Sequence, residues 1–134
     1  MSNPAARIGS EGSLETTMSR AVLVAALAAD EKLGHETVVL DMAELLAVVD
    51  AFVITSGRNV RQVKTLVEEI EEQVKADGGP SPLRIEGLQD GTWVLMDYGD
   101  FIVHVFLDEA RSFYDLEHLW SDVPRLTWGP STTA

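Results

Sequence analysis

The hydrophobic pattern is densest between Gly91 and Phe106, where two apolar, β-prone runs flank Tyr98-Gly99. Glycine supplies the positive φ that a tight turn needs, so this stretch predicts a β-hairpin. With Tyr98 and Gly99 as a two-residue loop, the predicted pairs are Asp97 with Asp100, Leu95 with Ile102, and Trp93 with His104. Both faces of this hairpin are apolar, which favours a sheet covered on both sides.

Helical and strand-like periodicities alternate along the rest of the chain. A helix is expected from Thr16 or Thr17, as its N-cap, to Leu33, and an amphipathic helix follows Asn59 and ends near Asp77. Shorter elements are expected as strands at 37–40, 51–54 and 83–86, the last near a sheet edge, a helical turn within 42–49, and a helix at 115–120 capped by Asp115.

This order of elements predicts an α/β fold bordering on α+β, with a mixed, mostly five-stranded sheet covered by helices. Strands linked by helical segments early in the chain are expected to be parallel neighbours, and the hairpin adds antiparallel pairs. We expect a single domain over 16–124, a flexible tail over 1–15 that is rich in Ser, Gly, Glu and Ala, and a C-terminal tail over 125–134.

Composition narrows the classes of function. The 134 residues are 46% hydrophobic, which is enough for a core without covalent staples. The absence of cysteine removes disulfides, cysteine–zinc sites and thiol nucleophiles, and it fits a cytoplasmic protein. No stretch is long and apolar enough for a membrane span, and no secretory signal is evident.

Charge bears on the partner. Ten Lys and Arg stand against 22 Asp and Glu, a net charge of −12. This balance argues against binding DNA and leaves little scope for direct contact with RNA, because affinity for nucleic-acid backbones comes from cationic groups. A basic protein partner is favoured, and the alternative is that acidity only aids solubility.

Two sets of residues suggest nucleotide or metal chemistry. Thr55-Ser56-Gly57 lies between a strand and a helix, where backbone N–H groups can bind phosphate, with Arg58 and Arg61 nearby. The P-loop and dinucleotide-binding patterns are absent, so a tight turn at Gly57 is the favoured interpretation.

Asp97 and Asp100 would face each other in the predicted register and could share Mg²⁺. No Asp-x-Asp stands on a strand, and a solvated turn is favoured, so we predict no metal and no cofactor. His104 lacks an evident catalytic partner and is expected to be a buried, hydrogen-bonded core residue. The remaining candidates are aromatic residues that serve either as interface anchors or as core, of which Tyr98, in the turn, is the one expected to meet a partner: Trp93, Tyr98, Phe113, Tyr114 and Trp120.

Several of these segments, in order and spacing, resemble the ribosomal silencing factor family, also called RsfS or Iojap, over about 18–124. The matching segments are Asp50-Ala-Phe-Val-Ile-Thr-Ser-Gly57, Gln62, Glu86-Gly87, Gly91-Thr-Trp93, Leu95-Met-Asp-Tyr-Gly-Asp100, His104-Val-Phe106, Arg111, Tyr114 and Leu116-Glu-His-Leu-Trp120. Departures are mild: Asn59 stands where Ser is common, and Met96 replaces a more usual Leu or Val.

The resemblance implies a nucleotidyltransferase-like fold without the catalytic acidic set, and a non-enzymatic role. Such factors bind protein fourteen of the large ribosomal subunit, block joining with the small subunit and lower translation when nutrients are short; some form homodimers. The contact residues implied are Trp93, Leu95, Asp97, Tyr98, Gly99 and Asp100, with Arg111, Tyr114 and Trp120 nearby. The alternative function is a metal-dependent nucleotidyltransferase or a nucleotide-binding protein.

Overall fold

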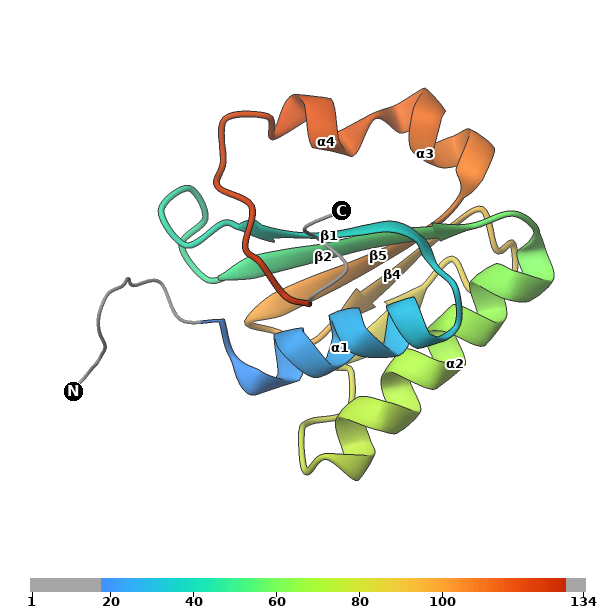
Figure 1. The fold of residues 1–134 in the computed structure, drawn as a ribbon, viewed down its shortest axis with the longest axis horizontal. Helices are drawn as coiled ribbons and strands as arrows, with labels where there is room; N and C mark the ends of the chain where they lie inside the picture. Colours follow the sequence, from blue (N-terminus) through green and yellow to red (C-terminus); the bar gives the residue numbers. More distant parts are fainter. Residues whose placement is uncertain (1–17, 130–134) are drawn as a thin grey trace.

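The sheet lies between two layers of helices in the computed structural model, which describes residues 18–129 (Figure 1). In chain order the elements are α1 (Arg20–Glu31), β1 (His35–Asp41), β2 (Ala51–Gly57), α2 (Val60–Ala76), β3 (Arg84–Glu86), β4 (Trp93–Asp97), β5 (Phe101–Leu107), α3 (Asp108–Tyr114) and α4 (Leu116–Leu119). Helices α1 and α2 cover one face of the sheet, and α3 and α4 lie over the other. The predicted α/β class and the mixed five-stranded sheet are confirmed.

The strand order is β1-β2-β5-β4-β3, and only β2 and β5 run parallel. The expectation that the early strands are parallel neighbours is therefore wrong for β1 and β2. Their connection over 42–50 holds only a turn, in which the N–H groups of Leu45 and Leu46 donate to the carbonyl of Met42 at 3.0 and 2.9 Å. A parallel pair needs a longer crossover than this, whereas a short connection returns the chain antiparallel.

The hairpin of β4 and β5 is confirmed, but its predicted register is wrong by two residues. Trp93 lies opposite Phe106 and Asp97 opposite Ile102. The Tyr98 N–H donates to the Phe101 carbonyl at 3.0 Å, so that Gly99 and Asp100 form the loop. Gly99 adopts a φ of 94°, which glycine tolerates. Because the shift is even, every side chain stays on its predicted face.

The N-terminal ends of the helices show which of the predicted capping residues form a cap. Asn59 caps α2 as predicted, accepting a hydrogen bond from the Gln62 N–H. Ser19 caps α1 in the same way, whereas Thr16 and Thr17 lie outside the described residues. Asp115 is not a side-chain cap, since its left-handed backbone (φ 49°) joins α3 directly to α4. That sharp joint keeps both of these helices short.

Beneath the sheet, α1 and α2 close the larger part of the core. Four buried alanines on α1 let it lie close to its neighbours, and α2 contributes a continuous buried stripe: Val63, Leu66, Val67, Ile70 and Val74. Side chains of this kind contribute roughly 1.5–3 kcal/mol each when fully buried. No helix within 18–129 combines the length and the hydropathy of a membrane span.

The segment after α4 protects one edge of the sheet. The Leu126 N–H donates to the Val39 carbonyl at 2.9 Å, and the buried Trp128 donates from its indole to the Thr37 carbonyl at 3.1 Å. Residues 125–128 of the predicted C-terminal tail are thus packed against β1. At the opposite edge, β3 is short and exposed, as predicted for 83–86.

Candidate partner-binding surface

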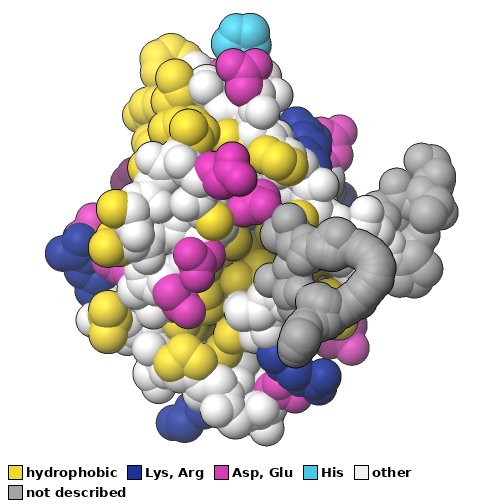
Figure 2. All heavy atoms as spheres, turned by 90° about the vertical axis from the view of Figure 1, so that its left-hand side faces the viewer, with side chains coloured by type: hydrophobic (Ala, Val, Ile, Leu, Met, Phe, Trp, Pro, Cys, Tyr) yellow, Lys and Arg dark blue, Asp and Glu magenta, His cyan; other side chains and the backbone are white. Residues whose placement is uncertain are grey.

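The face of the sheet under α3 and α4 is aromatic and only partly covered. Helices α3 and α4 have seven and four residues, too few to shield the strands below them. Phe113, Tyr114 and Leu119 project from these helices with 80%, 51% and 69% of their surface exposed. Hydrophobic side chains gather at the upper left of Figure 2, at the height at which Figure 1 places α3 and α4. Large apolar side chains exposed together are typical of interaction sites.

Trp93 links the strands to this exposed group. It is half-buried, and its ring centroid lies 4.8 Å from that of Tyr114 and 4.9 Å from that of Phe106. Its indole N–H donates to Nδ1 of His104 at 3.1 Å. The hydrogen bond and the rings on either side fix the orientation of the indole, so Trp93 shapes the surface while exposing part of itself.

His104 is the buried partner that Trp93 requires. Because Nδ1 accepts from the indole, the ring proton of the neutral histidine resides on Nε2. That Nε2 has no hydrogen-bond partner within residues 18–129, and Phe52 meets the ring edge to face at 4.7 Å. Burial lowers the pKa of His104 to about 4. The prediction of a buried, hydrogen-bonded core histidine is confirmed.

Arg111 lies beneath this surface and connects neighbouring segments through hydrogen bonds. Its guanidinium is buried and donates to the carbonyls of His35 and Glu36 at 2.7 and 2.6 Å, to Ser56 Oγ at 3.0 Å, and to both carboxylate oxygens of Glu117. The hydrogen bond and charge of Arg111 hold the pKa of Glu117 below its usual range. Arg111 thereby anchors α3 and α4 to the ends of β1 and β2, and acts on the surface by placing these helices.

At the hairpin turn, Tyr98, which we expected to meet a partner, is buried. Tyr98 is 5% exposed and stacks on Phe101, with ring centroids 4.5 Å apart, on the face that α2 covers. Alternation along β4 directs Tyr98 to the side opposite Trp93 and Leu95. Burial, with a smaller effect from the charge of Glu71, raises the pKa of Tyr98 to about 12.

The acidic residues of the turn do not face each other as predicted. Oδ1 of Asp97 accepts from the Gly99 N–H at 2.8 Å, and Oδ2 lies 3.4 Å from Nε of Arg84. Asp100 is exposed on the other side of the loop. This is the local turn chemistry favoured over a metal pair, and within residues 18–129 no three His, Asp or Glu side chains are placed so that they could hold a metal ion together.

The structure brings together Trp93, Leu95, Tyr114 and Trp120 on one face, with Asp97, Gly99 and Asp100 at the turn. Tyr98 lies behind that turn and Arg111 beneath the helices. Leu119, absent from the predicted contact residues, joins Phe113 and Tyr114 in the exposed group. Its apolar position on a helix of only four residues, which cannot bury a full stripe, is the signal in the sequence that points to it.

A second surface feature is a hollow lined by residues that are distant in sequence. Three carboxylates, Asp41, Asp50 and Asp100, border a hollow of about 210 Å³ whose floor is apolar. Figure 2 shows acidic side chains across the middle of this end of the molecule, with hydrophobic side chains between them. The sequence could not predict this hollow, because it forms only when the ends of three strands meet.

Comparison with known proteins decides the family. A family model described as ribosomal silencing factor during starvation matches residues 15–133. The chain belongs to the ribosomal silencing factor family. Its members are ribosome-binding regulators of translation without enzymatic activity, which agrees with the resemblance inferred from the sequence.

Individual relatives agree with this assignment. The ribosomal silencing factor RsfS of Bacillus subtilis is 40% identical over 101 residues, which cover 75% of this chain and 85% of the relative. A crystal structure of a Chromobacterium violaceum protein superposes with a TM-score of 0.72 at 30% identity, covering 81% of this chain and 89% of that one. A Bacillus halodurans crystal structure gives 0.66 at 35% identity, covering 78% and 93%.

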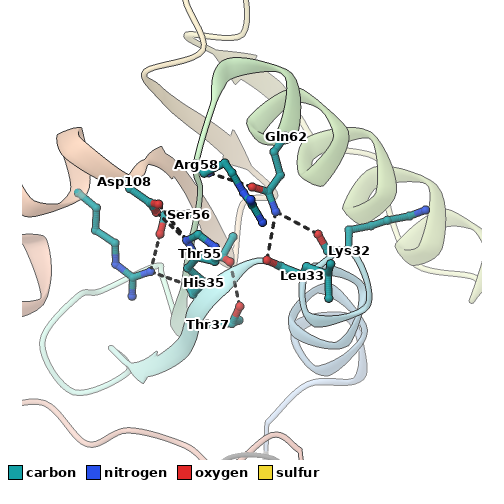
Figure 3. Close-up of polar contacts among 10 residues, drawn as sticks. Lys32, Leu33, His35, Thr37, Thr55, Ser56, Arg58, Gln62 and Asp108 are labelled. Atoms are coloured by element: carbon teal, nitrogen blue, oxygen red, sulfur yellow. Dashed lines mark hydrogen bonds and ion pairs between the residues drawn. The ribbon is translucent and has the colours of Figure 1, made fainter.

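In this silencing factor, the predicted phosphate-binding position is already occupied by the protein's own groups (Figure 3). Strand β2 extends through Thr55-Ser56-Gly57, and Thr55 pairs with Thr37 at 2.8 Å between their hydroxyls. Beyond it, Oε1 of Gln62 accepts from the Arg58 N–H at 2.8 Å, and the Gln62 N–H is bound by Asn59. A phosphate would have to displace these bonds, which argues against a phosphate site here. The tight turn expected at Gly57 is wrong, because Gly57 is the last residue of β2 and the chain bends at positions 58 and 59.

Proposed function

We propose that this silencing factor binds protein fourteen of the large ribosomal subunit through its α3–α4 face, and that by occupying this position it prevents joining of the small subunit. The contact surface comprises Trp93, Leu95, Tyr114 and Trp120 with Phe113 and the newly identified Leu119, bordered by the turn residues Asp97, Gly99 and Asp100. Tyr98 and Arg111 support this surface from behind. The factor would act in the cytoplasm, where subunits join.

The observation that carries the proposal is the exposed group of Phe113, Tyr114 and Leu119 beside the half-buried Trp93. Energetic hot spots at protein interfaces are enriched in aromatic residues that are held rigidly and lose water on binding. Trp93 is held by His104 and by the neighbouring rings, so little conformational freedom remains to be lost when a partner docks.

Charge supports the same type of partner. With a net charge of −12, the protein attracts a basic ribosomal protein, and long-range attraction of this kind speeds encounter. Asp100, exposed at the hairpin turn, would contribute to this steering. Steric blocking requires no catalytic group, only an affinity that competes with the association of the subunits.

The test has two stages. The factor and purified protein fourteen are mixed at micromolar concentration and passed through a sizing column, where we expect a joint peak. The factor is then added to large subunits before small subunits, and sedimentation should show fewer joined ribosomes. Separate elution would contradict the partner, and a joint peak without loss of joining would contradict the blocking mechanism.

Self-association is a second role for the same face. Two copies that met through Phe113 and Leu119 would remove these side chains from water, which motivates a homodimer. Light scattering across a range of concentrations measures it. If Leu119→Ser lowers both the dimer fraction and the binding of protein fourteen, the two partners share the surface; a dimer unaffected by the substitution uses another one.

A further inference from the structure

One corner of this acidic molecule is basic. Lys32 ends α1, Arg58 follows β2, and Arg61 lies in the first turn of α2; all three are exposed. They are three of only ten Lys and Arg residues in the chain. Within the described residues, none of the three side chains has a carboxylate at ion-pair distance, whereas Arg20, Arg84 and Arg125 all have one.

A single side chain assembles this corner. Gln62 accepts from the Arg58 N–H at 2.8 Å and donates from Nε2 to the carbonyls of Lys32 and Leu33 at 3.3 and 3.1 Å. Figure 3 shows Gln62 between Arg58 and the Lys32–Leu33 turn. Two segments about thirty positions apart in the sequence are thereby held together, so the backbones that carry Lys32 and Arg58 lie on either side of Gln62, with the Lys32 side chain extending away from Arg58 (Figure 3).

The basic corner lies at the same end of the sheet as Trp93. A Cβ placed on Gly91 would come within 2.6 Å of Cγ1 of Val60, so the loop that leads into Trp93 touches the first turn of α2. The Thr92 carbonyl in that loop accepts from the Leu107 N–H at 2.8 Å, which ties it to the last residue of β5. A large partner that covers Trp93 therefore reaches the neighbourhood of Arg58 and Arg61.

We propose that Lys32, Arg58 and Arg61 contact the phosphate backbone of ribosomal RNA when the factor is docked on the large subunit. This inference rests on the proposed docking through Trp93 and the α3–α4 face. Unpaired guanidinium and ammonium groups neutralise phosphates and release counterions, while the acidic remainder of the molecule repels RNA. The combination orients the factor, with the acidic and aromatic surface toward protein and the basic corner toward RNA, and it revises the expectation that RNA contact is negligible.

The first experiment compares two double variants with equal loss of charge. Lys32→Gln/Arg58→Gln removes two cations of the corner, and Arg20→Gln/Lys75→Gln removes two elsewhere. Binding to purified large subunits is measured from low to high salt. We expect the corner variant to bind roughly tenfold more weakly at about 0.1 M salt, with a salt slope smaller by about 2, and to bind isolated protein fourteen like the wild type.

The outcomes are separable. Equal losses in both double variants would mean that only net charge matters and would overturn the proposal, as would unchanged binding of the corner variant. A loss of affinity for isolated protein fourteen would assign the corner to a protein contact instead of RNA. If the wild type binds neither protein fourteen nor large subunits, it is the proposed function that fails.

A direct readout uses the absence of cysteine. Thr65→Cys creates a single thiol one turn beyond Arg61, on an exposed position of α2, for attachment of a photo-crosslinker. On large subunits we expect crosslinks to RNA from position 65 and few from Lys75→Cys at the far end of the helix. Crosslinks from position 65 to protein alone would overturn the proposal.

Discussion

The two faces of the sheet are built from different kinds of helix. On one side, α1 and α2, with 12 and 17 residues, cover the strands with fully buried aliphatic side chains. On the other, α3 and α4, with seven and four residues, leave Phe113, Tyr114 and Leu119 in solvent. The first arrangement maximises burial within the chain, whereas the second keeps apolar surface available for contact with another molecule.

The two faces also differ in how their helices are held to the sheet. The α1–α2 side is joined mainly by apolar contacts, while the α3–α4 side depends on directed bonds from Arg111 and from Trp93 to His104. Directed bonds hold a surface in one geometry even where few apolar atoms are buried. We therefore expect substitutions on the first face to change stability and substitutions on the second to change recognition.

The largest effect is expected for Leu66→Ala on α2. Leu66 is completely buried, so its truncation should leave a cavity and lower the free energy of unfolding by about 3–5 kcal/mol. Leu119→Ala, on the other face, should change it by less than about 0.5 kcal/mol. Urea unfolding of both variants measures the contrast, and similar losses would show that α4 contributes as much to the core as α2.

Next come Phe113→Ser and Leu119→Ser, which should each weaken binding of protein fourteen about tenfold to a hundredfold with little change in melting temperature. The matched control is Leu33→Ser, since Leu33 is 70% exposed, close to the 69% of Leu119, but follows α1 on the other side of the sheet. Equal affinity of all three variants would mean that the partner does not use the α3–α4 face.

Whether the sequence predicts a feature of these two faces depends on how far apart along the chain the residues that form the feature lie. Local signals succeeded: the stripe and the Asn59 cap identified α2, and the alternation along the hairpin assigned Trp93 and Leu95 to one face. The prediction that depended on the conformation of a single turn was wrong. The two-residue error in register placed Asp97 opposite Asp100, because the sequence does not reveal that Tyr98 bonds to Phe101 across the loop.

Features made by distant segments could not be predicted. Trp128 enters the core only because residues 124–126 bond to β1, and no periodicity marks a segment with so little regular structure. The backbones of Arg58 and Lys32 are linked through Gln62, a residue that the family resemblance includes but whose hydrogen bonds the sequence does not reveal. The contact residues implied by the family resemblance stay a prediction. Phe113 was already among the aromatic candidates, whereas Leu119 was recognised only from the short length of α4.

A smaller effect, which arises on the aromatic face alone, is the dependence of stability on pH through His104. The pKa of His104 is about 4 in the folded protein and near 6.5 in an unfolded chain. Its contribution to stability is fully present above pH 6.5 and is lost as the pH falls from 6.5 toward 4, because the unfolded chain binds the proton first. Between pH 7.5 and 5 we expect His104 to account for about 2 kcal/mol of lost stability.

The variant that isolates this effect is His104→Asn, which keeps an acceptor for Trp93 and does not titrate. His35 and His118 are present in both proteins, so the difference between the two unfolding curves across pH belongs to His104. If the wild type and the variant lose stability in parallel as the pH falls, His104 is not held neutral by burial.

The smallest effect is expected at the turn where the two faces meet. The Tyr98 hydroxyl is buried without a hydrogen-bond partner in residues 18–129, so Tyr98→Phe should raise the free energy of unfolding by about 0.5–1 kcal/mol. The ring, which stacks on Phe101, is unchanged, and binding of protein fourteen should be unaffected. Urea unfolding and the sizing column measure the two quantities. A loss of stability would mean that the hydroxyl has a hydrogen-bond partner. A loss of binding would mean that Tyr98 belongs to the contact surface, so that the two faces do not have separate roles at this position.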